Sequence, residues 1–147
     1  MTTDRQDFDE SIPHLMGTTK RALHLQMCRR LAEAKIDLSA EQIVILAHLQ
    51  QEDNLPQSFF VDLLLRDKTY ITRQIDDLEQ RGLVRRVHDE IDRRQKLVCL
   101  LPAGQKFMRP VRRIMEQVLA RAVRGIDPAE ITLFKRNLRK IAENLHE

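Results

Sequence analysis

Residues 68–100, KTYITRQIDDLEQRGLVRRVHDEIDRRQKLVCL, decide the fold of this chain. In their first part, Ile71, Ile75 and Leu78 recur at spacings of four and three, the pattern of a helix with one buried face. The polar side chains between them would lie on the opposite, solvated face. The spacing therefore predicts a helix over 68–81.

The pattern changes after Gly82, which stands where a helix commonly ends in a left-handed residue. Residues 83–87 and 96–100 are typical of short strands. The charged segment 88–95 between them is too long for a two-residue hairpin turn. The stretch therefore predicts a helix followed by a β-hairpin with an extended tip.

Helices are also expected on the N-terminal side of this unit. Apolar side chains over 12–36 form two neighbouring stripes at helical spacing, which favours burial against more than one partner. Ser39 and Gln42 have the spacing of a capping box, so a second helix should start after Ser39. Pro56 then precedes a short helix over about 57–64.

Two further helices are expected on the C-terminal side. Pro102 fits the first turn of one, and Asp127 with Glu130 forms the start signal of the other. The last helix, over 127–146, carries a narrow heptad-like apolar seam, which suits packing against another helix. This seam consists of Ile131, Phe134, Leu138, Ile141 and Leu145.

The order of the elements predicts the fold class. A helix-turn-helix followed by a β-hairpin wing occupies 40–101, and long helical segments, 12–36 and 102–146, flank it. We therefore predict a mainly α fold with a small β-hairpin wing, in which a winged helix-turn-helix lobe lies between N- and C-terminal dimerisation helices. The length of 147 residues suits one domain, 1–147.

The net charge is compatible with nucleic-acid binding without requiring it, and the sequence carries no catalytic motif. Lys and Arg total 25 against 22 acidic residues, which gives a net charge of +3, and no G-x-S-x-G, P-loop or H-E-x-x-H motif is present. Two cysteines make no disulfide framework, and no apolar run is long enough to span a membrane. We expect a cytoplasmic protein without a cofactor or a membrane partner.

At this point the residues resemble a known family. Residues 68–86 are similar to the recognition helix and wing entry of the MarR family of bacterial transcription regulators. Asp92-Arg93-Arg94 resembles the wing of that family, and Leu101-Pro102-Ala103-Gly104 resembles its wing exit. The resemblance is strongest over 60–104 and implies a winged-helix protein that regulates transcription.

This chain departs from the family pattern at the turn between the two helices. Leu65 replaces the usual glycine, so either the turn needs no positive φ or Leu65 adopts one at a cost. Leu63 replaces a residue that is typically charged, which would leave an exposed apolar patch.

The resemblance and the chemistry of groove recognition lead to one set of DNA-binding candidates. The first half of a recognition helix reads base edges in the major groove, and the candidates there are Lys68, Thr69, Tyr70, Thr72, Arg73 and Gln74. On the wing, Arg94 matches the family's minor-groove arginine, and Asp92 matches the carboxylate that orients it. Phosphate contacts are expected from Arg85, Arg86, Arg93 and Lys96, although a solvated hairpin explains this charged run equally well.

The resemblance further implies a homodimer that binds a pseudo-palindromic double-stranded DNA operator as a repressor. The expected dimer interface lies on the terminal helices and includes Ile12, Leu15, Met16, Ile131, Phe134, Leu138, Ile141 and Leu145. Members of the family are often released from DNA by a small aromatic or anionic effector, bound between the dimerisation helices and the lobe. The sequence alone does not indicate which residues would bind it.

Alternatives stay open beside this interpretation. One is a helical adaptor whose C-terminal seam binds a partner protein, with a purely structural wing. Another is a redox-sensing regulator that acts through Cys28. Cys28 follows His24 by four residues, a spacing that can share a metal, but we interpret the pair as a half-buried histidine beside a core thiol. Cys99 is expected in the core of the lobe.

Overall fold

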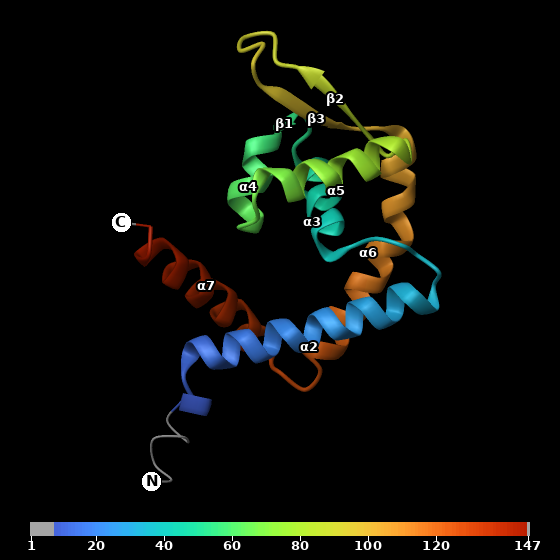
Figure 1. Cartoon of the computed structure of the whole chain (residues 1–147). Helices are drawn as coiled ribbons and strands as arrows, with labels where there is room; N and C mark the ends of the chain where they lie inside the picture. The colour runs from blue at the N-terminus through green and yellow to red at the C-terminus, as the bar shows by residue number, and fades with distance from the viewer. Residues whose placement is uncertain (1–7, 147) are drawn as a thin grey trace.

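The predicted elements form a helical molecule with a small sheet at one end (Figure 1). The structure is a computed structural model, and it describes residues 8–146. In chain order the elements are α2 (Ile12–Glu33), α3 (Ala40–Gln51), β1 (Leu55–Pro56), α4 (Gln57–Leu64), α5 (Lys68–Gln80), β2 (Val84–His88), β3 (Lys96–Leu100), α6 (Pro102–Ala122) and α7 (Pro128–Asn144). The mainly α fold with a winged lobe is therefore confirmed.

The core of the lobe forms where α3, α4, α5 and the sheet meet. The predicted inward face of α5 is correct, since Ile71, Ile75 and Leu78 have no exposed surface. They pack in one apolar cluster with Phe60 of α4 and Leu46 of α3. Burial of this face holds α5 against the lobe and leaves its opposite side free.

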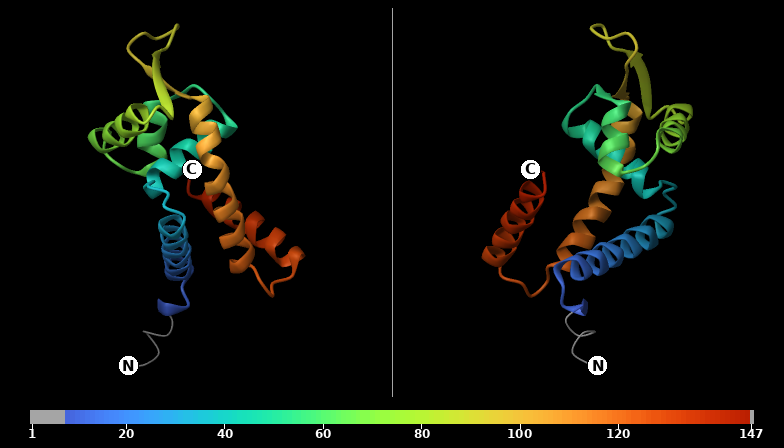
Figure 2. Two further views of the ribbon diagram at one scale, coloured as in Figure 1. Left: turned by 90° about the vertical axis from the view of Figure 1, so that its right-hand side faces the viewer. Right: turned by 60° about the vertical axis from the view of Figure 1, so that its left-hand side comes forward.

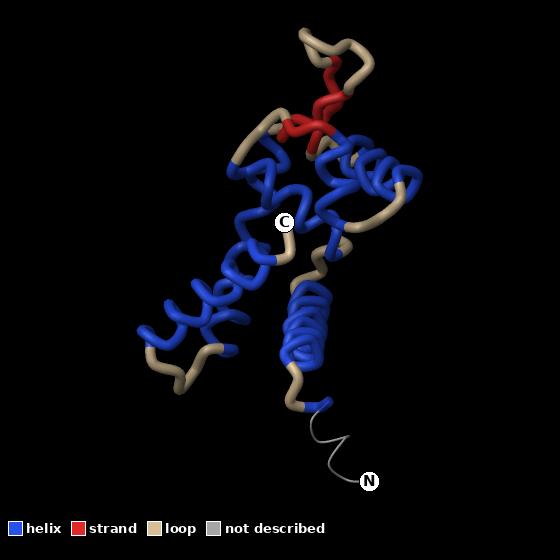
Figure 3. The backbone as a smooth tube through the Cα atoms, turned by 90° about the vertical axis from the view of Figure 1, so that its left-hand side faces the viewer, coloured by secondary structure: helices blue, strands red, loops and turns tan. Residues whose placement is uncertain are grey.

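The wing contains one strand more than the sequence predicted. The sheet order is β1-β3-β2, and all neighbouring strands are antiparallel, with Leu55 opposite Val98 and Val84 opposite Leu100. Two residues, one of them a proline, are too few to show an alternating pattern, so β1 has no sequence signal. Figure 3 shows the hairpin tip extending beyond the rest of the lobe.

Several helix ends follow from local backbone requirements. The long helix α2 stops at Glu33 and not at the predicted residue 36, because Lys35 has φ 55° and Ile36 N–H donates back to Leu31 O at 2.9 Å. Gly82, with φ 69°, ends α5 as predicted. A side chain at Gly104 would collide with the backbone oxygen of Leu83, so glycine lets α6 start directly against the lobe.

The terminal helices leave the lobe and contribute little to its core. α6 descends from the lobe and packs against α2, while α7 stands beside them (Figure 2). Leu31 is the one buried residue of α2, and no residue of α7 is buried. Of the predicted seam, Phe134 remains 54% exposed and Leu145 79% exposed. Within residues 8–146 no helix is long and apolar enough to cross a membrane.

Candidate nucleic-acid interface

The first two turns of α5 present three of the predicted DNA-binding side chains to solvent. Asp67 caps the helix, since its carboxylate accepts from the Tyr70 backbone N–H at 2.8 Å. Lys68, Thr69 and Arg73 are exposed, and Thr69 and Arg73 lie one above the other at a spacing of four. These three side chains are free to meet a ligand outside the lobe.

Three other candidates on α5 turn toward the protein. Tyr70 is half-buried under the Arg66 guanidinium, 4.9 Å from the ring centroid. The Thr72 hydroxyl accepts from Gln57 Nε2 at 2.7 Å and donates to a backbone oxygen of its own helix. Gln74 Oε1 accepts from the Ser39 hydroxyl at 2.9 Å. In this structure Thr72 and Gln74 bind neighbouring helices.

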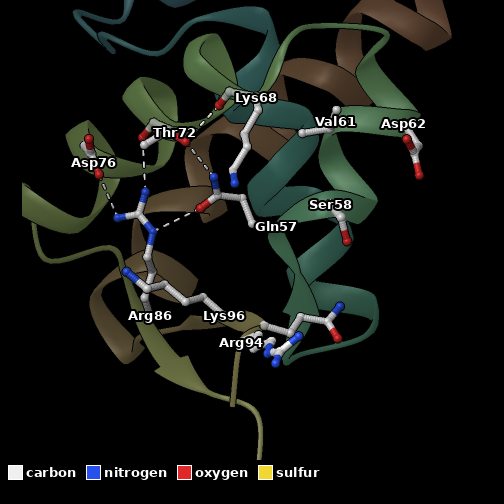
Figure 4. A pocket seen from close by; sticks show the side chains of 11 residues that line it. Gln57, Ser58, Val61, Asp62, Lys68, Thr72, Asp76, Arg86, Arg94 and Lys96 are labelled. Carbon is white, nitrogen blue, oxygen red and sulfur yellow. Dashed lines mark hydrogen bonds and ion pairs between the residues drawn. The ribbon is translucent and has the colours of Figure 1, made fainter. Parts of the chain in front are cut away.

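Arg86 differs from the free phosphate contact that the sequence suggested. Its side chain is 14% exposed and its Nη1 lies 2.7 Å from Asp76 Oδ1 and 3.5 Å from Glu79 Oε2. It also donates to Thr72 O at 3.1 Å and to Gln57 Oε1 at 3.2 Å. Arg86 therefore ties β2 to α5 and α4, as Figure 4 shows. Gln57, which sequence reasoning missed, completes this tie from the start of α4.

The side chains of Arg85 and Arg86, which are neighbours on β2, project from opposite faces of the strand. Arg85 is exposed and pairs in register with Cys99 on β3, on the face of the hairpin that points away from Arg86. Burial raises the pKa of the Cys99 thiol, which donates to Asn54 Oδ1 at 2.8 Å. The expectation that Cys99 belongs to the core is confirmed, because the residue is buried.

The wing tip is closed by its own acidic side chains. Asp92 Oδ1 accepts from the Arg94 backbone N–H at 3.1 Å, and Asp92 O accepts from Gln95 N–H at 2.9 Å. Asp89 Oδ1 accepts in the same way from Ile91 N–H at 3.0 Å. Asp92 thus acts on the backbone of Arg94, whereas the resemblance implied an effect on its side chain. Arg93 and Arg94 are both exposed.

A cavity of about 550 Å³ brings part of α5 and part of the wing together (Figure 4). Its walls come from α4, from α5 and from the wing. Lys68, Arg86, Arg94 and Lys96 are its cationic residues, and Asp62 and Asp76 are its carboxylates. Thr69, Tyr70, Arg73, Gln74, Arg85 and Arg93 lie outside it. With Arg86 bound to Asp76, three cations remain at this surface.

The turn between α4 and α5 has the strained conformation that the sequence left open. Leu65 has φ 50° and ψ 42°, and its side chain is 89% exposed. Leu63 beside it is exposed as expected. Arg66 Nη2 lies 3.0 Å from Glu41 Oε1 of α3. Burial opposes the ionisation of Glu41, but a backbone hydrogen bond and this ion pair outweigh it, so the pKa of Glu41 is lowered.

A second, apolar cavity of about 200 Å³ lies between the terminal helices and the lobe. It is lined from α2, α3 and α6 by Leu23, His24, Met27, Ala40, Ile43, Met115, Val118 and Leu119. His24 is the one polar side chain among them. The space is open to solvent, and its volume exceeds the roughly 150 Å³ that holds a benzene ring in a closed apolar interior, so it has room for one small ring.

The interpretation of Cys28 as a core thiol is wrong. Cys28 is exposed, because α2 packs its other face on α6. His24, which was expected to be half-buried, is exposed as well. Its sulfur lies 3.5 Å from His24 Nε2. Across the described part of the chain, no three His, Cys, Asp or Glu side chains gather into a metal-binding group.

Comparison with known proteins agrees with this geometry. The sequence profile of the MarR family matches residues 38–96, which cover the lobe from the start of α3 to the wing. The transcriptional regulator HosA of Escherichia coli is 26% identical over 121 residues, 82% of this chain and 90% of HosA.

Solved structures extend the similarity beyond the lobe. A MarR-family transcriptional regulator from Silicibacter pomeroyi superposes with a TM-score of 0.79 at 27% identity, over 90% of this chain and 88% of that protein. BpsR of Bordetella bronchiseptica, whose DNA binding is regulated by 6-hydroxynicotinic acid, gives 0.78 at 27% identity, over 92% and 95%. Residues 38–96 thus match the MarR family, and the chain as a whole is similar in sequence and fold to transcription regulators of that family.

Proposed function

We propose that the chain is a sequence-specific double-stranded DNA-binding repressor. The observation that carries this proposal is the common exposure of Lys68, Thr69 and Arg73 on α5, beside Arg94 and Lys96 of the wing. A helix and a cationic hairpin in this order suit the major groove and the adjacent minor groove. Arg73 can bind a guanine edge with two hydrogen bonds, and Lys68 and Lys96 suit phosphates.

The structure narrows the set of residues that we assign to DNA. Gln74 and Arg86 serve the lobe, and Tyr70 and Thr72 are held partly inside it. Arg85 and Arg93 lie away from the shared cavity and remain phosphate candidates on the flank of the wing. We therefore place base reading on Thr69 and Arg73, and minor-groove contact on Arg94.

The functional form we propose is a homodimer acting on bacterial DNA in the cytoplasm. The lobe, 40–101, binds DNA, and the helical segments 12–36 and 102–146 form the dimer. Ile12, Leu15 and Met16 of α2 are exposed, and so are Phe134 of α7 and Leu145 at its C-cap. A pairing of these faces between two copies would remove them from water. Two lobes would then meet a pseudo-palindromic operator.

We also propose that a small aromatic effector releases the DNA. The apolar cavity lies between the dimerisation helices and the lobe, and its lining favours a ring over a charged group, because His24 is its one polar side chain. BpsR, at 27% identity, responds to 6-hydroxynicotinic acid, a small aromatic acid. The sequence led us to expect an aromatic or an anionic effector. The apolar lining of this cavity favours an aromatic one, and His24 is the one lining side chain that could bind an anion.

Selection of bound sequences from random duplexes tests the proposal. The selected operator is then titrated with the wild type and with Arg73→Ala, and Arg139→Ala on α7, another exposed arginine, serves as a control. We expect Arg73→Ala to cost about 1–3 kcal/mol on the operator and less on random DNA. Equal losses on both would make Arg73 a phosphate contact.

The same titration separates the alternatives. Binding that weakens steeply as salt rises supports a DNA-binding regulator. A wild type that binds no duplex at low salt would leave the helical adaptor as the better interpretation. Release of DNA by peroxide, and its loss in Cys28→Ser, would instead support the thiol-based alternative.

A further inference from the structure

The first turn of α3 lies between the apolar cavity and the recognition helix. Ala40 and Ile43 form part of the cavity wall. Ser39 and Gln42, on the other side of the same turn, bind α5 through hydrogen bonds. One helical turn therefore contacts both the proposed effector space and the element that we assign to base reading.

Gln42 is the centre of this contact. It is 5% exposed, and it is the one buried polar residue in the described part of the chain. Its Oε1 accepts from Ser39 N–H at 3.0 Å, and its Nε2 donates to Asp77 Oδ2 at 2.7 Å. The same Nε2 lies 3.5 Å from Gln74 O. Breaking the hydrogen bonds of a buried amide raises the free energy, so Gln42 resists separation of α3 from α5.

The tie continues along α5. Asp77 Oδ2 also lies 3.5 Å from Arg81 Nη1, and this nitrogen donates to Asp37 O at 2.7 Å, just before α3. The Arg81 guanidinium covers the Phe107 ring of α6 at 5.3 Å from its centroid. The C-terminal end of α5 is thus held to the segment 37–42, which also contributes Ala40 to the apolar cavity.

We propose that Gln42 couples the apolar cavity to the position of the recognition helix. A body that fills the cavity presses on Ala40 and Ile43 and shifts the first turn of α3. Gln42 transmits this shift to Asp77, because α5 cannot stay in place without breaking a buried hydrogen bond. This inference rests on the proposed function, since it assigns a route to the release of DNA.

A substitution inside the cavity replaces the unknown effector as the probe. Ala40→Leu adds three carbon atoms to the wall and mimics an occupied cavity. Gln42→Glu keeps the acceptor for Ser39 N–H but removes the donor to Asp77 and sets two carboxylates against each other. Adding Asp77→Asn to Gln42→Glu restores a donor–acceptor pair in the reverse direction. Gln57→Ala is the matched control, because it breaks the separate tie of α5 to α4 at Thr72.

Two measurements are made on each variant, operator affinity and the backbone amide shifts of α5 in the DNA-free protein. We expect Ala40→Leu to weaken operator binding by about fivefold or more, a typical coupling between sites, and to move the amides of Gln74 and Asp77. In the Gln42→Glu background, Ala40→Leu should change neither the operator affinity nor the amide shifts of α5. Both effects should return in the combination with Asp77→Asn, and they should persist in the Gln57→Ala background.

The outcomes separate this inference from the proposed function. A wild type that binds no duplex DNA overturns the proposed function. The amide shifts would still decide whether Gln42 couples the apolar cavity to α5. Effects of Ala40→Leu that survive Gln42→Glu, or that vanish equally in Gln57→Ala, overturn the inference. If Gln42→Glu does not fold, Asp77→Ala removes the same acceptor from a side chain that is 53% exposed and carries the same expectation.

Discussion

At the scale of single residues, neighbours of the same chemical type have different tasks in this protein. Arg85 and Arg86 follow each other on β2, where successive side chains leave on opposite faces. Arg86 is enclosed by Asp76, Gln57 and the Thr72 backbone, and Arg85 is exposed. On α5, Arg73 points outward and the adjacent Gln74 binds Ser39. Residue type identified the candidates, but direction decides which of them can meet DNA.

Leu65 supports a prediction at this scale. A left-handed conformation costs a residue with a Cβ about 1–2 kcal/mol, and the exposed Leu65 side chain recovers little by packing. Leu65→Gly should therefore raise the free energy of unfolding by about 0.5–1 kcal/mol after the larger chain entropy of glycine is subtracted. Urea denaturation measures the change. Leu65→Ala is the control, and an equal gain there would mean that removal of the apolar surface, and not the backbone, is responsible.

At the scale of elements, the wing is a hairpin whose tip is held by backbone hydrogen bonds. Asp92 and Asp89 close it, and no core residue lies in 89–95, since Ile91 is 96% exposed. Its base is held by β1 on one edge and by Arg86 on the other side. Loss of a tip side chain should therefore change DNA contact without changing the stability of the lobe.

A prediction for the wing follows, because its tip side chains contribute nothing to the core of the lobe. Arg94→Ala should weaken operator binding by about tenfold or more, which corresponds to about 1.4 kcal/mol, with an unchanged denaturation midpoint. Asp92→Ala should weaken binding less, because it frees the tip backbone and leaves the guanidinium in place. Filter binding or fluorescence anisotropy on the selected operator gives the values. Arg85→Ala, on the far face of the hairpin, should have the smallest effect, and unchanged binding in Arg94→Ala would show that the wing does not enter the groove.

At the scale of the whole molecule, the terminal helices leave apolar surface that one chain does not cover. α7 has no buried residue, although Ile131, Leu138 and Ile141 are half-buried, and α2 buries only Leu31. Apolar seams of this kind are stabilised by helix-on-helix packing. A two-fold dimer would satisfy them and would place two recognition helices about 34–36 Å apart, one turn of DNA.

Leu138→Asp tests the dimer. An unpaired carboxylate in the seam should cost several kcal/mol and should split or unfold the dimer. Operator affinity should fall with it, because a single lobe loses the effective concentration of its partner. Arg139→Asp places the same charge on the adjacent exposed position and should keep the dimer. Analytical ultracentrifugation at micromolar concentration decides, and a wild type that sediments as a monomer yet binds a half-site as well as a palindrome would contradict the dimer.

The sequence by itself determined the order of the helices, the two strands of the hairpin and the buried face of α5. Periodicity placed Ile71, Ile75 and Leu78 in the core, and capping residues such as Ser39 and Asp127 set helix starts, because both signals are local. Only the tertiary structure decided β1, the early end of α2 and the left-handed Leu65. It also decided that the side chains of Gln74 and Arg86 are held by other residues of the lobe, and that Gln42 lies between the apolar cavity and α5. The hydrogen bonds of Gln74 and Gln42 join residues 35 positions apart, and the end of α2 and the conformation of Leu65 depend on a backbone angle. Neither kind of feature leaves a periodic trace in the sequence.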